Sequence, residues 1–243
     1  MSETSHPKVT TFPDPAPGGF EFTSDNWEKA RKELAKYPAD HKASAVLALL
    51  WLAQKQLGNH LTDEAIEYVA GILDMAPIRV HEVAHFYSMF NLKPVGEYFV
   101  QVCRTTPCWL VGADDLAATV REKLGTPEGE VTEDGKFSWR YVECLGACCN
   151  GPMVQINDWY YEDLTPEILA RLLDDLRVGR EVNIGSQQGR RGSEPDGGLT
   201  TLTAVTETGH PDYPFGGGAD AEPVAVRQAR EAAESADKTG GGQ

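Results

Sequence analysis

From residue 24 to about residue 92, the apolar positions recur at the spacing of α-helices. A first helix is predicted over residues 25–37, with Ser24 as its N-cap, and a second over residues 42–57, ending at Gly58. The second helix carries apolar residues on most of its surface. We therefore expect it to be the buried helix of a bundle.

Two further helices complete this part of the pattern. Thr62, which is followed by two acidic residues, predicts the start of a third helix, and Pro77 predicts the start of a fourth. The inward face of the fourth helix is predicted to carry Val80, Val83, Phe86 and Met89. Residues 21–92 are therefore predicted to form a helical bundle domain.

The period changes to that of β-strands at residue 96. Strands are predicted over residues 96–103, 136–143, 153–156 and 159–162, helices over 112–124 and 165–179, and turns at Asp134-Gly135 and Asn157-Asp158. This order suits a small sheet covered by two helices. The predicted fold class is α+β, with the helical bundle followed by an α/β domain over residues 93–180.

The two ends of the chain have a different composition. Residues 1–20 are rich in Pro and Gly, which predicts a flexible arm. Residues 181–243 contain almost no large apolar side chains, which predicts an extended or disordered tail. The alternative for this tail is an arm that becomes ordered on a partner protein.

Composition excludes several classes of protein. The formal net charge of −15 disfavours a nucleic-acid-binding role, which rewards a basic surface. The first residues lack the apolar segment of a signal peptide, and the longest apolar stretch, residues 43–53, is too short to span a membrane. The odd number of cysteines, five, argues against a complete disulfide framework. We therefore expect a soluble chain in a reducing cytoplasm, without a recognisable nucleotide-binding motif.

Four of the five cysteines form two close pairs at the ends of predicted strands. Cys103 and Cys108 follow the first predicted strand, and Cys144 and Cys148 follow the second. If these strands are neighbours, four thiolates converge from two loops, as an iron–sulfur cluster requires. The loops contain mainly small residues that let the backbone approach a cluster, namely Thr105, Thr106, Pro107, Gly146 and Ala147. The pattern favours a [2Fe-2S] cluster, with structural zinc and redox-active or inert thiols as alternatives.

Two further motifs invite a functional interpretation. Cys149 is adjacent to Cys148 and cannot readily point at the same iron, so we expect a small core residue or a neighbour of the cluster. Residues 81–85, HEVAH, match the H-E-x-x-H pattern of zinc proteases, but no third ligand follows on the same helix. We expect this match to be a coincidence of helix packing and surface residues. The aromatic Trp109 and residues 159–161 are expected in the core or at an interface.

Three segments of the chain resemble one protein family. Residues 142–157 (VECLGACCNGPMVQIN), 102–108 (VCRTTPC) and 80–90 (VHEVAHFYSMF) resemble the thioredoxin-like [2Fe-2S] ferredoxin subunit of respiratory NADH:quinone oxidoreductase (complex I). The resemblance covers about residues 20–180. The family usually has Thr in place of His85, which further weakens the protease interpretation. Cys149 and Gly151 also depart from the family pattern, although neither occupies a ligand position.

The resemblance implies a thioredoxin-like domain over residues 93–180 and one [2Fe-2S] cluster held by Cys103, Cys108, Cys144 and Cys148. It also implies docking against a flavoprotein subunit that carries FMN and the NADH site, and assembly with other peripheral-arm subunits. The chain would then transfer electrons without a complete active site of its own. It would lie on the inner face of the bacterial plasma membrane through the complex.

Two alternatives to this function remain open from the sequence. One is the equivalent diaphorase subunit of an NAD-linked hydrogenase or formate dehydrogenase. The other is a zinc-stabilised binding module without a redox role.

Overall fold

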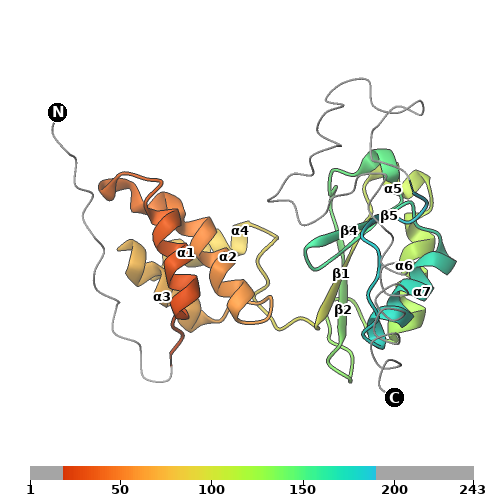
Figure 1. The fold of residues 1–243 in the computed structure, drawn as a ribbon, viewed down its shortest axis with the longest axis horizontal. Helices are drawn as coiled ribbons and strands as arrows, with labels where there is room; N and C mark the ends of the chain where they lie inside the picture. The colour runs from red at the N-terminus through yellow and green to blue at the C-terminus, as the bar shows by residue number, and fades with distance from the viewer. Residues whose placement is uncertain (1–18, 190–243) are drawn as a thin grey trace, which may run out of the picture. The chain divides into compact units, whose positions relative to one another are not determined.

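The computed structural model of the chain describes residues 19–189 (Figure 1). Backbone contacts divide the chain into two compact units, residues 1–97 and residues 98–243. The predicted arm and most of the predicted tail lie outside the described residues, so the proposed domain bounds stay a prediction. None of the helices among the described residues is long and apolar enough to cross a membrane.

The first unit is built from helices. Its elements are α1 (Ser24–Leu34), the 3-10 helix η1 (Ala39–Ala45), α2 (Val46–Gln56), α3 (Asp63–Leu73) and α4 (Pro77–Phe86). The four predicted helices are therefore present, and Thr62 caps α3 as expected. Three details of the prediction are wrong. Thr23, not Ser24, is the N-cap of α1, and α1 ends at Leu34 rather than at residue 37. The first residues of the predicted second helix belong to η1.

The inward face of α4 also differs from the prediction. Val80 is buried and Val83 is half-buried, whereas Phe86 is 80% exposed and Met89 is 42% exposed. Residues three apart on an α-helix are rotated by about 300°, so the predicted stripe turns away from the core by about 60° at every step. The buried face instead runs from Val80 to Ala84, and Met89 lies beyond the end of the helix.

A buried amide ties the segment after α4 to the bundle. Gln54 on α2 is only 2% exposed. Its Nε2 donates to the carbonyl of Met89 at 3.1 Å, and its Oε1 accepts the backbone N–H of Asn91 at 2.7 Å. Both backbone groups belong to the segment after α4, which forms no helix or strand, so the Gln54 amide supplies partners that regular secondary structure does not.

The second unit is a mixed sheet with helices. Its strands are β1 (Tyr98–Cys103), β2 (Phe137–Val142), β3 (Val154–Ile156), β4 (Trp159–Glu162) and β5 (Gly185–Ser186), in the spatial order β2-β1-β3-β4-β5. Its helices are α5 (Thr106–Leu110), α6 (Ala113–Leu124), the 3-10 helix η2 (Cys148–Asn150) and α7 (Pro166–Arg177). Strands β1 and β2 are parallel, β3 is antiparallel to both β1 and β4, and β5 is parallel to β4.

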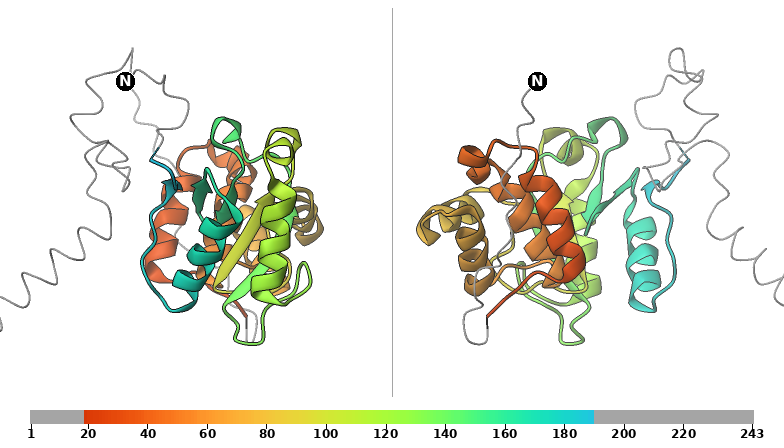
Figure 2. Two further views of the ribbon diagram at one scale, coloured as in Figure 1. Left: turned by 90° about the vertical axis from the view of Figure 1, so that its right-hand side faces the viewer. Right: turned by 60° about the vertical axis from the view of Figure 1, so that its left-hand side comes forward.

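Helices α6 and α7 lie side by side and cover one face of this sheet (Figures 1 and 2). Leucines from both helices share one apolar core with the side chains of Val100, Phe137 and Trp139 from β1 and β2. The prediction of a small sheet covered by two helices is therefore confirmed. The short elements α5 and β5 were not predicted.

The outer edge of β2 is occupied by the preceding loop. The N–H groups of Gly129 and Thr132 donate to the carbonyls of Trp139 and Phe137, each at 2.8 Å. The N–H of Tyr141 donates to the carboxylate of Glu128 at 2.9 Å. Residues 128–132 thus satisfy the side of β2 that faces away from β1.

Strand β5 lies within the segment that the sequence assigned to the tail. It pairs with β4, and the Ser186 hydroxyl donates to the Asp163 carboxylate at 2.5 Å. Val182 and Ile184 pack against the core of the second unit. Residues 181–189 therefore complete the sheet.

Candidate functional site

The two cysteine loops leave the sheet at the same end. Strands β1 and β2 are hydrogen-bonded neighbours in parallel register, with Cys103 opposite Val142. Because both strands run in the same direction, the segments that follow them start side by side. The condition under which the sequence predicted that the four thiolates converge is therefore met.

The first pair of cysteines is buried. Cys103 ends β1 and is 2% exposed, and Cys108 lies in α5 and is 1% exposed. The sequence predicted a loop here, but Pro107 lies in the first turn of a short helix, where its fixed φ angle is favourable. This helical turn brings the Cys108 thiol back to Cys103, and the two pack with Ala113 and Met153.

The second pair of cysteines is exposed. The Cys144 and Cys148 sulfurs are 3.5 Å apart. Two thiolates on one tetrahedral metal, with metal–sulfur bonds of about 2.3 Å, lie about 3.8 Å apart. The two sulfurs are therefore close enough to bind one metal ion. Gly146 lies between them with φ +86°, a conformation that glycine adopts without strain.

The segment after Cys148 connects the two pairs. A Cβ atom on Gly151 would lie 3.3 Å from the Cys108 sulfur, so this segment passes directly against the first pair. Asn150 is fully buried, its Nδ2 donates to the Glu162 carboxylate at 2.7 Å, and its carbonyl accepts the Asp163 N–H at 2.8 Å. These bonds fix the second cysteine loop to β4.

The thiols are crowded enough to perturb each other. Burial, followed by the hydrogen bond and the charge of Cys103, raises the pKa of Cys108 to about 12. The hydrogen bond with Cys144 raises the pKa of Cys148. Burial and the charges of Cys144 and Cys103 raise this pKa further. A metal must replace these protons when it binds, because thiolates are the ligands. The soft sulfur donors suit iron–sulfur clusters and zinc.

The sulfurs are arranged as two pairs. Among residues 19–189, no three His, Cys, Asp or Glu side chains converge closely on one point. The segment that follows Cys148 nevertheless passes within 3.3 Å of the Cys108 sulfur, measured from a Cβ position on Gly151, so the pairs are neighbours.

The structure also locates the other singled-out residues. Cys149 is exposed on η2, so the expected core position is wrong, because the 3-10 turn directs it outward.

His85 Nδ1 bonds to the carbonyl of His81 in its own helix at 2.8 Å. Glu82 accepts two hydrogen bonds from Arg79, at 2.8 and 3.1 Å. These contacts are typical of residues on a helix surface.

The expected place of the aromatic residues is confirmed in part. Tyr161 is 3% exposed and belongs to the core, while Trp109 is 52% exposed. Tyr160 packs against the buried cysteines, and its hydroxyl donates to the carbonyl of Leu145 at 2.6 Å. Sequence reasoning missed this contact and the Asn150 anchor. The only signal for Tyr160 was the strand alternation that points it to the opposite face from Tyr161.

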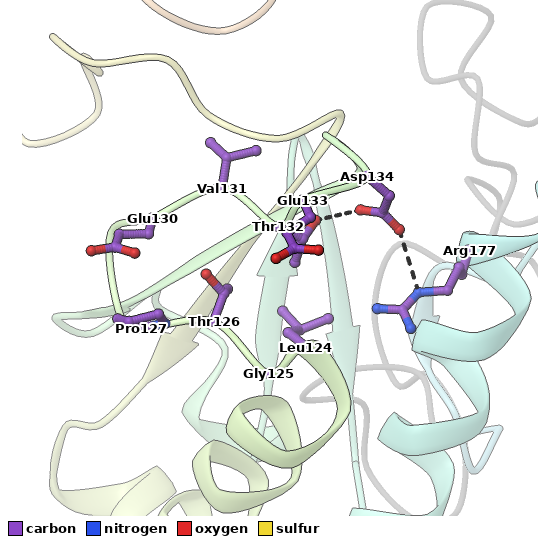
Figure 3. A pocket seen from close by; sticks show the side chains of 10 residues that line it. All are labelled: Leu124, Gly125, Thr126, Pro127, Glu130, Val131, Thr132, Glu133, Asp134 and Arg177. Carbon is purple, nitrogen blue, oxygen red and sulfur yellow. Dashed lines mark hydrogen bonds and ion pairs between the residues drawn. The ribbon is translucent and has the colours of Figure 1, made fainter.

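A pocket of about 580 Å³ lies elsewhere in the second unit (Figure 3). It is formed where β2 begins, whereas the cysteine loops follow the ends of β1 and β2. Asp134 bonds to Thr132 at 2.5 Å and pairs with Arg177 at 3.9 Å on its wall. No cysteine lines this pocket, so it is separate from the cysteine site.

Comparisons with known proteins bear on this site. The sequence profile of the thioredoxin-like [2Fe-2S] ferredoxin family matches residues 30–177. A protein of Rickettsia bellii named as the E subunit of NADH-quinone oxidoreductase is 56% identical over 158 residues, which are 65% of this chain and 95% of that protein. The Dictyostelium discoideum protein named NADH dehydrogenase [ubiquinone] flavoprotein 2, mitochondrial, is 47% identical over 183 residues, 75% of this chain and 74% of that protein.

Among solved structures, an NAD+-reducing [NiFe]-hydrogenase in the H2-reduced state matches 54% of this chain and 22% of that chain. Its TM-score is 0.48 and its identity is 18%, so this likeness supports no argument about function.

The matched region of the family profile includes both cysteine pairs and all elements from α2 to α7. The predicted thioredoxin-like α+β fold class and the predicted [2Fe-2S] cofactor are thereby confirmed. The chain belongs to the thioredoxin-like [2Fe-2S] ferredoxin family.

Proposed function

We propose that this chain is the electron-transfer ferredoxin subunit of an NADH-quinone oxidoreductase. The observation that carries the proposal is the arrival of two cysteine pairs at one end of the sheet, from the adjacent parallel strands β1 and β2. The names of the relatives from Rickettsia bellii and Dictyostelium discoideum support it. The complex holds the chain on the inner face of the bacterial plasma membrane.

The proposed ligands are Cys103, Cys108, Cys144 and Cys148. A bound [2Fe-2S] cluster supplies a group that accepts and returns one electron. The chain's residues determine its surroundings. Met153 and Ala113 exclude water from the buried pair, while the exposed pair is directed to the surface through which an electron partner can approach.

The partner in this proposal is the flavoprotein subunit that carries FMN and the NADH site. Trp109, Leu110 and Val111 follow Cys108 directly and are 52%, 70% and 54% exposed. We call these three residues the α5 patch. Asp114 accepts the Trp109 indole N–H at 2.9 Å and pairs with Arg104 at 3.3 Å. A tryptophan held in place on the surface loses little conformational entropy on binding, which favours a docking role.

Cluster ligation is tested by single changes of cysteine to serine. The purified chain should contain two irons and two sulfides, absorb visible light and give an EPR signal after reduction. Serine at any of the four proposed ligand positions should remove or greatly weaken that signal. The matched control is Cys149→Ser, which should retain it. A colourless chain with stoichiometric zinc contradicts the proposal, as does loss of the signal in the control.

Docking is tested by the affinity of the chain for the purified flavoprotein subunit. Truncation of a central aromatic anchor costs about 2 kcal/mol or more, so Trp109→Ala should weaken binding by about 30-fold. Val178→Ala is the control, because Val178 is also exposed in the second unit, at 64%, but lies at the end of α7. Equal affinities of the two variants contradict the α5 patch as the docking surface. Proteins that copurify with the chain distinguish complex I from a hydrogenase or formate dehydrogenase.

A further inference from the structure

Tyr160 is placed to orient one peptide group in the exposed cysteine loop. This half-buried side chain on β4 packs against the buried cysteine pair. Its hydroxyl donates to the carbonyl oxygen of Leu145 at 2.6 Å, across 15 positions of sequence. The bond therefore links the sheet to the middle of the loop between Cys144 and Cys148.

The same peptide group reaches a proposed ligand on its other side. The Leu145 carbonyl and the Gly146 N–H belong to one planar trans peptide and point in opposite directions. The Gly146 nitrogen donates to the Cys144 sulfur at 3.4 Å. Gly146 has φ +86°, so the chain can turn here without a strained side chain. Holding the Leu145 carbonyl in place thus aims the Gly146 N–H at the Cys144 sulfur. The hydrogen bond from the Tyr160 hydroxyl also polarises this peptide group, which makes its N–H a stronger donor.

We propose that Tyr160 is a positioning residue that raises the reduction potential of the [2Fe-2S] cluster through the Gly146 N–H bond to Cys144. The inference rests on the proposed ligand set. Reduction adds one electron and breaks no bond in the chain, and it increases the negative charge shared by the cysteine sulfurs. An N–H that donates to such a sulfur therefore stabilises the reduced state more than the oxidised state.

The test is a potentiometric titration of the cluster-loaded chain, followed by EPR. Tyr160→Phe keeps the ring and removes the hydroxyl, so the Leu145–Gly146 peptide loses its anchor. Weakening one hydrogen bond should shift the one-electron equilibrium by about three- to tenfold, which is about 30–60 mV toward more negative potentials. Tyr141→Phe is the matched control, because its hydroxyl bonds to Arg121 and it should leave the potential unchanged.

A second variant covers the case in which Tyr160→Phe does not assemble the cluster. Replacement of Tyr160 by 3-fluorotyrosine keeps the hydroxyl and makes it a stronger donor, so the potential should become more positive. Pulsed EPR gives an independent readout, since the coupling of the unpaired electron to the Gly146 nitrogen should weaken in Tyr160→Phe.

The possible failures are distinguishable. An intact cluster whose potential stays unchanged in Tyr160→Phe, or moves as far in Tyr141→Phe, overturns the role of Tyr160 and leaves the proposed function standing. A fluorotyrosine variant with an unchanged or more negative potential also overturns it. A wild-type chain that contains no iron and sulfide overturns the proposed function, and the role of Tyr160 with it.

Discussion

Replacing Asn150 by alanine should release the cluster faster, because Asn150 fixes the loop that carries Cys148. Asn150 is fully buried, and its amide donates to the carboxylate of the half-buried Glu162 at 2.7 Å. A hydrogen bond to a charged group contributes about 1.5–3 kcal/mol, so its loss should favour opening of the loop by about 10- to 140-fold. The Asn150 Oδ1 atom is buried without a hydrogen-bond partner. Its removal offsets part of the cost, and we expect the lower half of that range.

The assay is the decay of visible absorbance of the loaded chain in the presence of an iron chelator. If the chelator reaches the iron through the open loop, the decay rate increases by the same factor as the opening equilibrium. Gln155→Ala is the matched control. This variant removes an amide on the adjacent β3 that donates to the Asn157 carbonyl at 2.7 Å, away from the cysteine loops.

A decay of Asn150→Ala no faster than that of Gln155→Ala refutes the reasoning. A double-mutant cycle adds a second check, because the Asn150 change should have little further effect once Glu162→Ala has removed its partner. Full additivity of the two changes would show that they act separately.

Three further predictions concern other parts of the molecule. His81→Ala combined with His85→Thr should leave the metal content of the chain unchanged, and loss of a stoichiometric zinc would contradict this. Gln54→Leu removes the partners of the buried Asn91 N–H and of the partly buried Met89 carbonyl, and should lower the free energy of unfolding by about 2–4 kcal/mol in urea. Gln56→Leu, whose hydrogen bonds are mostly exposed, should cost less than about 1 kcal/mol. Burial raises the pKa of Tyr161 to about 12, so stability that is present below about pH 10 should be lost as the pH rises toward 12, and Tyr161→Phe should abolish that loss; an unchanged pH profile in this variant would contradict the assignment.

The long elements and the cysteine pairs were predictable because their signals are local. Alternation of apolar residues before Cys103 and Cys144 predicted two strands, and the position of each cysteine at a strand end predicted convergence. Thr62 and Pro77 predicted helix starts through side-chain and backbone properties of single residues. These features depend little on the rest of the fold.

The features that were missed depend on contacts distant in sequence or on very short elements. Helix α5 has five residues, too few for a period, and β5 consists of Gly185 and Ser186. The bond from Tyr160 to Leu145 exists only because β4 lies beside the cysteine loop. The exposure of Phe86 follows from the rotation of α4 against its neighbours, which spacing alone did not determine.

The loop of residues 128–132 has a consequence for how the sheet can associate. Unpaired edge strands are templates for β-sheet extension between molecules, and β2 carries the large apolar residues Phe137 and Trp139. Since the loop already bonds to its outer edge, a foreign strand cannot add there without displacing Gly129 and Thr132. Within residues 19–189, the opposite edge of the sheet is β5, where Gly185 and Ser186 offer only a short length of backbone. We therefore expect the loop to hinder the addition of a foreign strand at β2.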